Sequence, residues 1–216
     1  MAYRPVGIPS GWHTIRLAYH PAVRREGSRL YTRKKIMADD KFQGRYRIDS
    51  ARLADYDYGS NGMYFITICT QNRESYFGEI IADEENSCTL LPTPVGQRAI
   101  QGWQTIPQFS SFVQLDAFQL MPNHIHGVLW ISKPNYTEWE PNRFGPQSQN
   151  LASIMRGFKS GVTMYALNNQ LEFGWQARYY DRVIRNDDEL HRIRQYIANN
   201  PTNWHQDQNN VENLFM

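Results

Sequence analysis

Runs of apolar residues separated by turn residues predict a mixed α/β domain. The strongest strand signal lies at 63–70, Met-Tyr-Phe-Ile-Thr-Ile-Cys-Thr, which is β-branched, aromatic and bounded by turn residues. Its density of apolar residues predicts that both of its faces are buried. Further strands are expected at 113–121 and 124–131, joined as antiparallel neighbours by Pro122-Asn123, and one or two short strands within 77–91, around a turn at 83–86.

Three other segments have the apolar spacing of helices. In the segment 95–106 the side chains of Val95, Ala99 and Trp103 fall near one helical face, and Pro107 is expected to end that helix. The segment 151–171 is the longest helical pattern. The third helix is expected at 187–199, capped by Asn186 and with an acidic first turn. Between the second and third helices, the segment 175–184 is expected to be extended. The resulting order of elements predicts an α+β fold, an antiparallel sheet with helices packed mainly on one face.

The charge is distributed unevenly between two predicted regions. Residues 1–48 contain 11 Lys and Arg against 3 Asp and Glu, together with several Pro and Gly, so they are expected to form a basic, largely irregular extension before a domain at 49–216. Such an extension is typical of an arm that contacts a polyanion and equally of a solvated tail, and Met37 is an alternative start. The segment 133–150 is rich in Pro, Asn and Gly and is expected to be a long surface loop.

Composition excludes several classes of protein. At 41% hydrophobic residues the chain is expected to be globular, and it contains no apolar run near the roughly 20 residues of a membrane span. The N-terminus lacks the apolar region of a secretory signal, and two cysteines make no disulfide framework, so a cytoplasmic, nucleoid-associated location is expected. The P-loop, the dinucleotide-binding glycine pattern and the serine hydrolase elbow are also missing from the sequence.

The candidate chemistry centres on His124 and His126. Alternate side chains of a strand share a face, so these imidazoles are expected about 7 Å apart along one face and able to share a metal ion. On the predicted helix 151–171, Tyr165 and Asn169 are four residues apart and share a helical face. We interpret Asn169 as the third metal ligand and Tyr165 as a nucleophile; the alternatives are hydrogen-bonded strand histidines and a tyrosine packed in the core.

Glycines and basic residues surround this candidate site in the sequence. Gly157 and Gly161 lie on the same helical stripe as Tyr165, and glycines inside a helix often allow another backbone or a ligand to approach closely. Basic residues near aromatic ones suit single-stranded nucleic acid, with a solvated edge strand as the alternative interpretation. The residues expected to contact DNA are Asn123, Arg156, Lys159, Arg178, Arg182 and Arg185, with Tyr179 and Tyr180 beside the last three.

Five stretches of the sequence resemble the HUH-type single-strand tyrosine transposases, in particular the REP-associated branch. They are Tyr64–Thr70, Met121–Gly127 (Met-Pro-Asn-His-Ile-His-Gly), Phe158–Thr163, and Tyr180–Arg185 together with Tyr196–Pro201. The resemblance covers about residues 45–204 and implies a ferredoxin-like α/β plait with the two histidines on a central strand. It also implies a divalent metal, Mg²⁺ or Mn²⁺, and a helix tyrosine that attacks DNA, which is assigned to Tyr165, with Asn169 as the amide ligand.

The reaction that the resemblance implies is cleavage and rejoining of single-stranded DNA near hairpins through a 5′-phosphotyrosine. The expected partner is single-stranded DNA, and no interaction with a membrane is expected. The protein is expected to be a monomer or a homodimer. Two alternatives stay open at this point. One is a replication-initiator or relaxase-type nickase with the same chemistry, and the other is a nucleic-acid-binding module that does not cleave.

Overall fold

The computed structural model describes residues 41–42, 45–46, 56–82, 88–136 and 148–207. The chain divides into two units, Met1–Ile48 and Asp49–Met216. In the first unit, β1 (Lys41–Phe42) pairs antiparallel with β2 (Arg45–Tyr46). The predictions of a basic extension, of a turn at 83–86 and of a loop at 133–150 fall largely outside the described residues.

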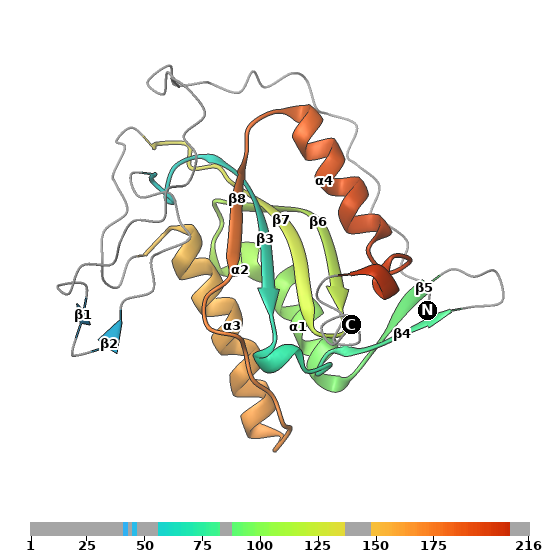
Figure 1. Ribbon diagram of the computed structural model, residues 1–216. Helices are drawn as coiled ribbons and strands as arrows, with labels where there is room; N and C mark the ends of the chain where they lie inside the picture. Colours follow the sequence, from blue (N-terminus) through green and yellow to red (C-terminus); the bar gives the residue numbers. More distant parts are fainter. Residues whose placement is uncertain (1–40, 43–44, 47–55, 83–87, 137–147, 208–216) are drawn as a thin grey trace. The chain divides into compact units, whose positions relative to one another are not determined.

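The second unit is built on a four-stranded antiparallel sheet. Its strands are β6 (Val113–Met121), β7 (His124–Ile131), β3 (Gly62–Cys69) and β8 (Tyr180–Ile184), in that spatial order (Figure 1). Since every neighbouring pair is antiparallel, β3 runs parallel to β6, and β7 runs parallel to β8. The chain between each parallel pair is therefore a crossover, and the normal right-handed sense places both crossovers on the same face of the sheet.

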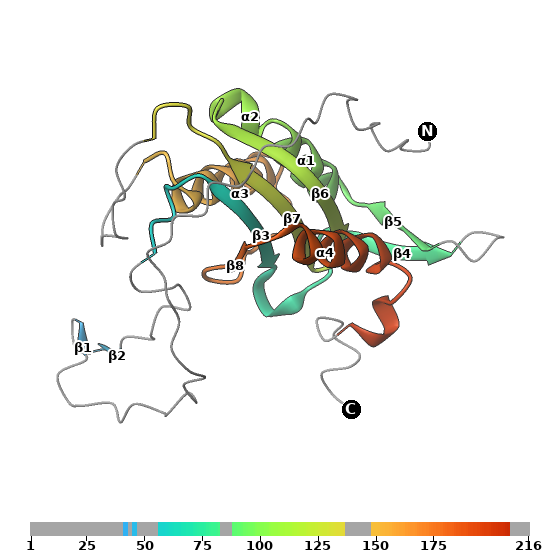
Figure 2. The same ribbon diagram turned by 90° about the horizontal axis from the view of Figure 1, so that it is seen from above.

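Helices cover both faces of this sheet, one of them more fully. The helices α1 (Pro94–Gln104), α2 (Ile106–Phe109) and α3 (Leu151–Asn168) belong to the two crossovers and lie on one side. The helix α4 (Asp187–Asn199) follows the last strand and lies on the other side (Figure 2). The predicted α+β plait, an antiparallel sheet with helices mainly on one face, is confirmed.

Successive side chains of β7 point to opposite faces of the sheet, so this strand contributes to two hydrophobic clusters. Ile125 and Leu129 are fully buried against Met155 and Phe158 of α3 in the larger core cluster. Val128 faces the opposite way, into a smaller cluster with Phe65, Ile184 and the α4 residues Leu190 and Ile197. A strand covered on both faces reads as a continuous apolar run, which is what the sequence of β7 shows apart from its two histidines.

Several boundaries differ from the predicted ones. Pro107 does not end the first helix, because α1 already ends at Gln104 and Pro107 stands in the first turn of α2, where a missing N–H costs nothing. The extended segment predicted at 175–184 is a strand only from Tyr180. The short strands predicted within 77–91 are confirmed as the hairpin β4 (Gly78–Ala82) and β5 (Cys88–Pro92).

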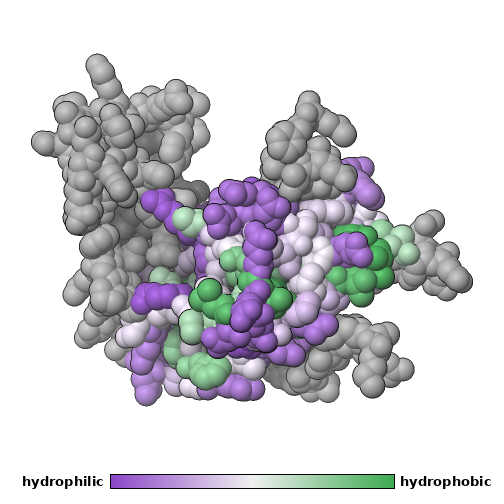
Figure 3. Space-filling model, turned by 90° about the horizontal axis from the view of Figure 1, so that it is seen from below, coloured by the Kyte–Doolittle hydropathy of each residue, from purple (hydrophilic) through white to green (hydrophobic). Residues whose placement is uncertain are grey.

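The surface of the domain is mixed in character. Figure 3 shows hydrophilic and hydrophobic residues side by side over the domain seen from below. Exposed apolar side chains of the described residues include Ile81, Leu91 and Leu167. Within the part of the chain that the structure describes, no helix is both long and apolar enough to cross a membrane.

Gly127 allows β7 to pack closely against Trp103, and replacing it by alanine is expected to destabilise the fold. A Cβ at this position would lie 2.3 Å from Cζ2 and 2.6 Å from Cη2 of Trp103, a side chain that is 1% exposed. The rigid indole cannot move without disturbing Phe118 and Phe158, which contact it. We expect Gly127→Ala to lower the free energy of unfolding by about 1–3 kcal/mol in urea denaturation. An unchanged midpoint would contradict this packing.

Candidate active site

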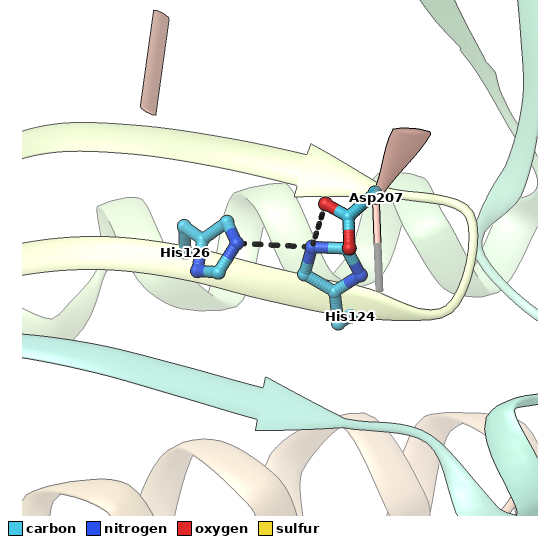
Figure 4. A group of neighbouring side chains, drawn as sticks. All are labelled: His124, His126 and Asp207. Atoms are coloured by element: carbon cyan, nitrogen blue, oxygen red, sulfur yellow. Dashed lines mark hydrogen bonds and ion pairs between the residues drawn. The ribbon is translucent and has the colours of Figure 1, made fainter. Parts of the chain in front are cut away.

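The two histidines of β7 point to the face of the sheet that carries α4. His124 and His126 are 0% and 2% exposed, and their Nε2 atoms lie 3.1 Å apart (Figure 4). Their neighbours across the strand pairs are Cys69 and Thr67 of β3. The prediction that both imidazoles share one face of a strand is therefore correct in geometry, and the tight turn at Pro122-Asn123 places them at the end of the sheet.

Hydrogen bonds on the far side of each ring orient the imidazoles. Asn123 donates through Nδ2 to the backbone carbonyl of Arg73 (2.9 Å), so its Oδ1, 2.9 Å from Nδ1 of His124, must accept the imidazole proton. Nε2 of neutral His124 then presents a lone pair. Nδ1 of His126 is 2.9 Å from Oγ1 of Thr67, which leaves Nε2 of His126 directed at the same point. Two lone pairs this close repel each other unless a proton or a cation lies between them.

A carboxylate and an amide complete this group of side chains. Oδ2 of Asp207 lies 3.8 Å from Nε2 of His124, and candidate ligand atoms of His124, His126 and Asp207 all lie within 4.8 Å of one another. Asn200, which caps the end of α4, donates through Nδ2 to Oδ2 of Asp207 (3.0 Å). The Oδ1 atom of Asn200 is buried and accepts no hydrogen bond from the described residues. Four side chains with nitrogen or oxygen lone pairs therefore meet here.

A tyrosine of α4 reaches the same point. The hydroxyl of Tyr196 lies 3.2 Å from Nε2 of His126, and its ring stands edge-on to that imidazole at 5.1 Å between centroids. The side chain is 45% exposed, so its other side is open to a ligand. Tyr196 and Asn200 are four residues apart, which places both on the face of α4 that looks toward the histidines.

Contacts of α4 with the sheet hold Tyr196 in place. Leu190 and Ile197 pack into the smaller core cluster, and Arg194 makes a two-pronged ion pair with Asp116 of β6, at 2.8 Å and 2.5 Å. At the start of the helix, Oδ1 of Asn186 accepts the N–H of Glu189 at 2.8 Å, as its sequence predicted. The helix that carries Tyr196 is thus held by its N-terminal cap, by the packing of its apolar face and by an ion pair to β6.

Burial keeps both imidazoles neutral at ordinary pH. Burial lowers the pKa of His126 from 6.5 to about 4, although the Asp207 carboxylate opposes the shift. Burial, followed by the nearby His126 and Arg73, lowers the pKa of His124 well below its ordinary value. Burial and then Asp207 raise the pKa of Tyr196, with a smaller opposing effect of Asn200. The phenol is therefore protonated at neutral pH in the absence of a further cation.

This donor set fits a divalent cation. Neutral imidazole nitrogens suit Zn²⁺, Fe²⁺ and related metals, whereas carboxylate and amide oxygens suit Mg²⁺ and Mn²⁺. A second layer of hydrogen bonds, between the imidazoles and the side chains of Asn123 and Thr67, fixes the rings, as is usual for metal-binding histidines. The Oδ1 atom of Asn200, which accepts no hydrogen bond from the residues that the structure describes, adds a lone pair that a bound cation or its water would satisfy.

The structure does not bring Tyr165 and Asn169 to the histidines. The buried face of α3, which includes Met155 and Phe158, packs on the side of β7 that carries Ile125, while the histidines point to the other side. Asn169 is exposed, and its Nδ2 donates to the carbonyl of Tyr165 at 2.8 Å. The geometry therefore does not support Asn169 as the third ligand or Tyr165 as the nucleophile beside this group.

The residues expected to contact DNA are spread over different parts of the domain. Asn123 is 0% exposed and orients His124. Nζ of Lys159 donates to the carbonyls of Gln176 and Arg178, and so fixes the segment before β8 onto α3. Arg182 pairs with Glu189 at 2.6 Å on the face of the sheet that carries the histidines. The remaining positions are Arg156 and Arg178, which line a hollow beside α3, and Arg185, whose N–H donates to Glu189.

Gly157 lies on an open part of α3, and replacing it by alanine is expected to stabilise the protein. A Cβ at Gly157 would meet nothing within 4 Å among the described residues, and one at Gly161 would lie 3.5 Å from Nη2 of Arg98. Glycine in a helix interior costs about 0.8–1 kcal/mol relative to alanine. We expect Gly157→Ala to raise the free energy of unfolding by about that amount, measured by urea denaturation. A loss of stability would instead show that another part of the protein approaches this glycine.

Sequence reasoning missed Tyr196, Asn200 and Asp207 as members of the group. A signal for the first two was present, since Tyr196 and Asn200 repeat the tyrosine-asparagine spacing of Tyr165 and Asn169 on a later helix. Asp207 lies beyond α4 and its short 3₁₀ helix Trp204–Gln206, in a polar segment without a recognisable pattern. Only the three-dimensional structure identifies that carboxylate.

Comparisons with known proteins agree with the fold. The chain is 40% identical over 168 residues to an uncharacterized protein of Haemophilus influenzae, a match that covers 74% of this chain and 91% of the relative. No protein-family model matches the chain. A solved structure of a REP-associated tyrosine transposase bound to a REP hairpin has a TM-score of 0.50 and 17% sequence identity, over 74% of this chain and 77% of that one. At that identity the likeness concerns the fold.

Proposed function

The chain belongs to the family of the Haemophilus influenzae protein, and we propose that it is a metal-dependent single-stranded DNA endonuclease and strand transferase, with Tyr196 as its nucleophile. The observation that carries the proposal is the approach of the Tyr196 hydroxyl to within 3.2 Å of a buried imidazole, in a group of side chains that could hold a metal ion. The neighbour of similar fold, a tyrosine transposase bound to a REP hairpin, supports hairpin-forming DNA as the substrate class.

Each residue has a distinct role in the proposed reaction. His124, His126 and Asp207 would hold Mg²⁺ or Mn²⁺, with Asn200 beside them. When bound, such a cation supplies Lewis-acid stabilisation of the scissile phosphate. Asn123 and Thr67 keep the imidazoles in the required orientation, and α4 fixes the phenolic oxygen next to them. This arrangement replaces the assignment of Tyr165 and Asn169 that the sequence alone suggested.

The proposed chemistry is a transfer of the phosphoryl group to tyrosine. The oxygen of Tyr196 attacks phosphorus, the bond from phosphorus to the 3′ oxygen breaks, and a 5′-phosphotyrosine and a 3′-hydroxyl result. The phenolic proton is lost to water, and the departing 3′ oxygen takes up a proton. Because the ester conserves the energy of the phosphodiester bond, a 3′-hydroxyl can reverse the step and join strands without a nucleotide cofactor.

Trapping of the covalent product tests this function. Wild-type protein is incubated with end-labelled hairpin-forming oligonucleotides from around its own gene, in Mn²⁺, in Mg²⁺ or in EDTA, and separated on a denaturing gel. We expect a protein–DNA adduct that forms with either metal and disappears in EDTA. Binding of DNA without any adduct over several hairpins and both metals would overturn the proposal in favour of a non-cleaving binding module.

A further inference from the structure

Arg73 has a buried nitrogen for which the described protein provides no partner. It ends the short 3₁₀ helix Gln71–Arg73 that follows β3, and its Nη1 is buried without a hydrogen bond in the described residues. A buried guanidinium N–H that is not hydrogen-bonded costs a few kcal/mol. Such a group is expected to have a ligand, and the surroundings of Arg73 indicate which ligand.

The backbone at Arg73 is held in an uncommon conformation. Asn72 and Arg73 have φ angles of 51° and 60°, in the left-handed region that side-chain-bearing residues rarely adopt. The carbonyl of Arg73 accepts from Asn123, and its N–H donates to the carbonyl of Thr70. Each left-handed residue costs of order 1 kcal/mol. Strain of this kind is concentrated at functional sites, and here it occurs in the backbone that carries one cationic side chain.

Arg73 lies next to the histidine group. Asn123 connects them directly, since it donates to the Arg73 carbonyl and accepts from Nδ1 of His124. Cys69, four residues before Arg73, pairs with His124 across the two strands and shares its face of the sheet. The positive charge of Arg73 also lowers the pKa of both Cys69 and His124, although burial raises that of Cys69 overall.

We propose that Arg73 is a catalytic residue that binds a non-bridging oxygen of the scissile phosphate beside His124, an inference that rests on the proposed function. A guanidinium presents its donors in a fixed plane that matches phosphate oxygens and stays protonated at any working pH. Negative charge grows on those oxygens as Tyr196 attacks, and a preorganised cation in a site of low solvent content stabilises that change. The bound phosphate would supply the partner that Nη1 lacks.

Charge removal at Arg73 tests the inference. Arg73→Gln removes the cation, Arg73→Lys retains a charge without the planar donors, and Arg98→Gln on α1 is the matched control for loss of one positive charge. For each protein, three quantities are measured: Mn²⁺ affinity, hairpin affinity, and the single-turnover rate of adduct formation at saturating DNA. Melting temperatures show that the compared proteins are folded.

We expect Arg73→Gln to slow adduct formation without a comparable loss of Mn²⁺ affinity. Arg73→Gln should slow adduct formation about 100- to 1,000-fold while Mn²⁺ affinity changes at most a few-fold. Arg73→Lys should recover part of the rate, and Arg98→Gln should match wild type. A wild-type rate in Arg73→Gln would overturn the role of Arg73 and leave the proposed function standing. Absence of the adduct in wild type would instead overturn both.

Discussion

Tyr196→Phe is expected to abolish covalent attachment of DNA, whereas Tyr165→Phe should form the adduct at the wild-type rate. The phenolic oxygen of Tyr196 is the only atom removed, and that atom lies 3.2 Å from Nε2 of His126. Loss of a nucleophile usually slows an enzyme by more than about a thousandfold. The measurement is the single-turnover yield of adduct with labelled hairpin DNA and Mn²⁺ on a denaturing gel.

Two properties of Tyr196→Phe should stay close to wild type. Its melting temperature should change by only a few degrees, because the ring still packs against Phe65 and His126. Its Mn²⁺ affinity should also be retained, since His124, His126 and Asp207 are unchanged. The reverse pattern, with an active Tyr196→Phe and an inactive Tyr165→Phe, would show that α3 provides the nucleophile in spite of its position on the far face of the sheet.

The second large effect is expected from His124→Ala. Nε2 of His124 lies 3.1 Å from Nε2 of His126 and 3.8 Å from Oδ2 of Asp207. We expect Mn²⁺ affinity to fall by more than about 100-fold, beyond the range seen when only a supporting hydrogen bond is lost, and adduct formation to become undetectable. Isothermal titration calorimetry at pH 7.5, where the buried imidazoles are neutral, measures the affinity.

His191→Ala is the matched control for that experiment. His191 is exposed on α4 and is not a member of the histidine group, so its loss should leave both the affinity and the adduct unchanged. The thermal melting of His124→Ala in EDTA separates loss of the metal site from loss of the fold. Full Mn²⁺ affinity in folded His124→Ala would contradict the assignment of this group as the metal site.

Most of the sheet was predictable from local pattern. The strands β6 and β7 begin and end at the predicted residues, because Pro122-Asn123 is an unambiguous turn between two apolar runs. The cap and bounds of α4 were also predictable from Asn186 and the acidic first turn. The early end of α1 was not predictable, since Thr105 closes that helix and Ile106 begins α2, with Pro107 inside its first turn.

The site was only half predictable, because side-chain spacing does not say which face of a sheet a helix covers. Tyr165–Asn169 and Tyr196–Asn200 have the same spacing, so the sequence offered two equivalent helices. The position of each helix in the order of elements decides which face of the sheet it covers. The helix α3 lies in the crossover between the parallel strands β7 and β8 and therefore packs on the same face as α1, where Ile125 of β7 points. The histidines alternate to the other face, on which α4 lies.

The glycines of α3 illustrate a second limit of sequence reasoning. Gly157 and Gly161 suggested close approach by a ligand or another backbone, but the described residues leave the space at Gly157 open. Gly127, within the histidine motif, is instead a glycine that the close approach of a neighbouring side chain requires. The need for glycine there depends on Trp103, 24 positions earlier in the chain, and no local pattern reveals it.

Mapping the modified tyrosine in the wild-type adduct tests the central claim most directly. Trypsin separates the two candidates, since Gln195–Met216 contains Tyr196 as its only tyrosine and Ser160–Arg178 contains Tyr165 as its only tyrosine. After nuclease trimming, mass spectrometry should find the nucleotide mass on Gln195–Met216 and fragment ions should place it on Tyr196. A nucleotide on Ser160–Arg178, or on neither peptide, would contradict the proposed active site.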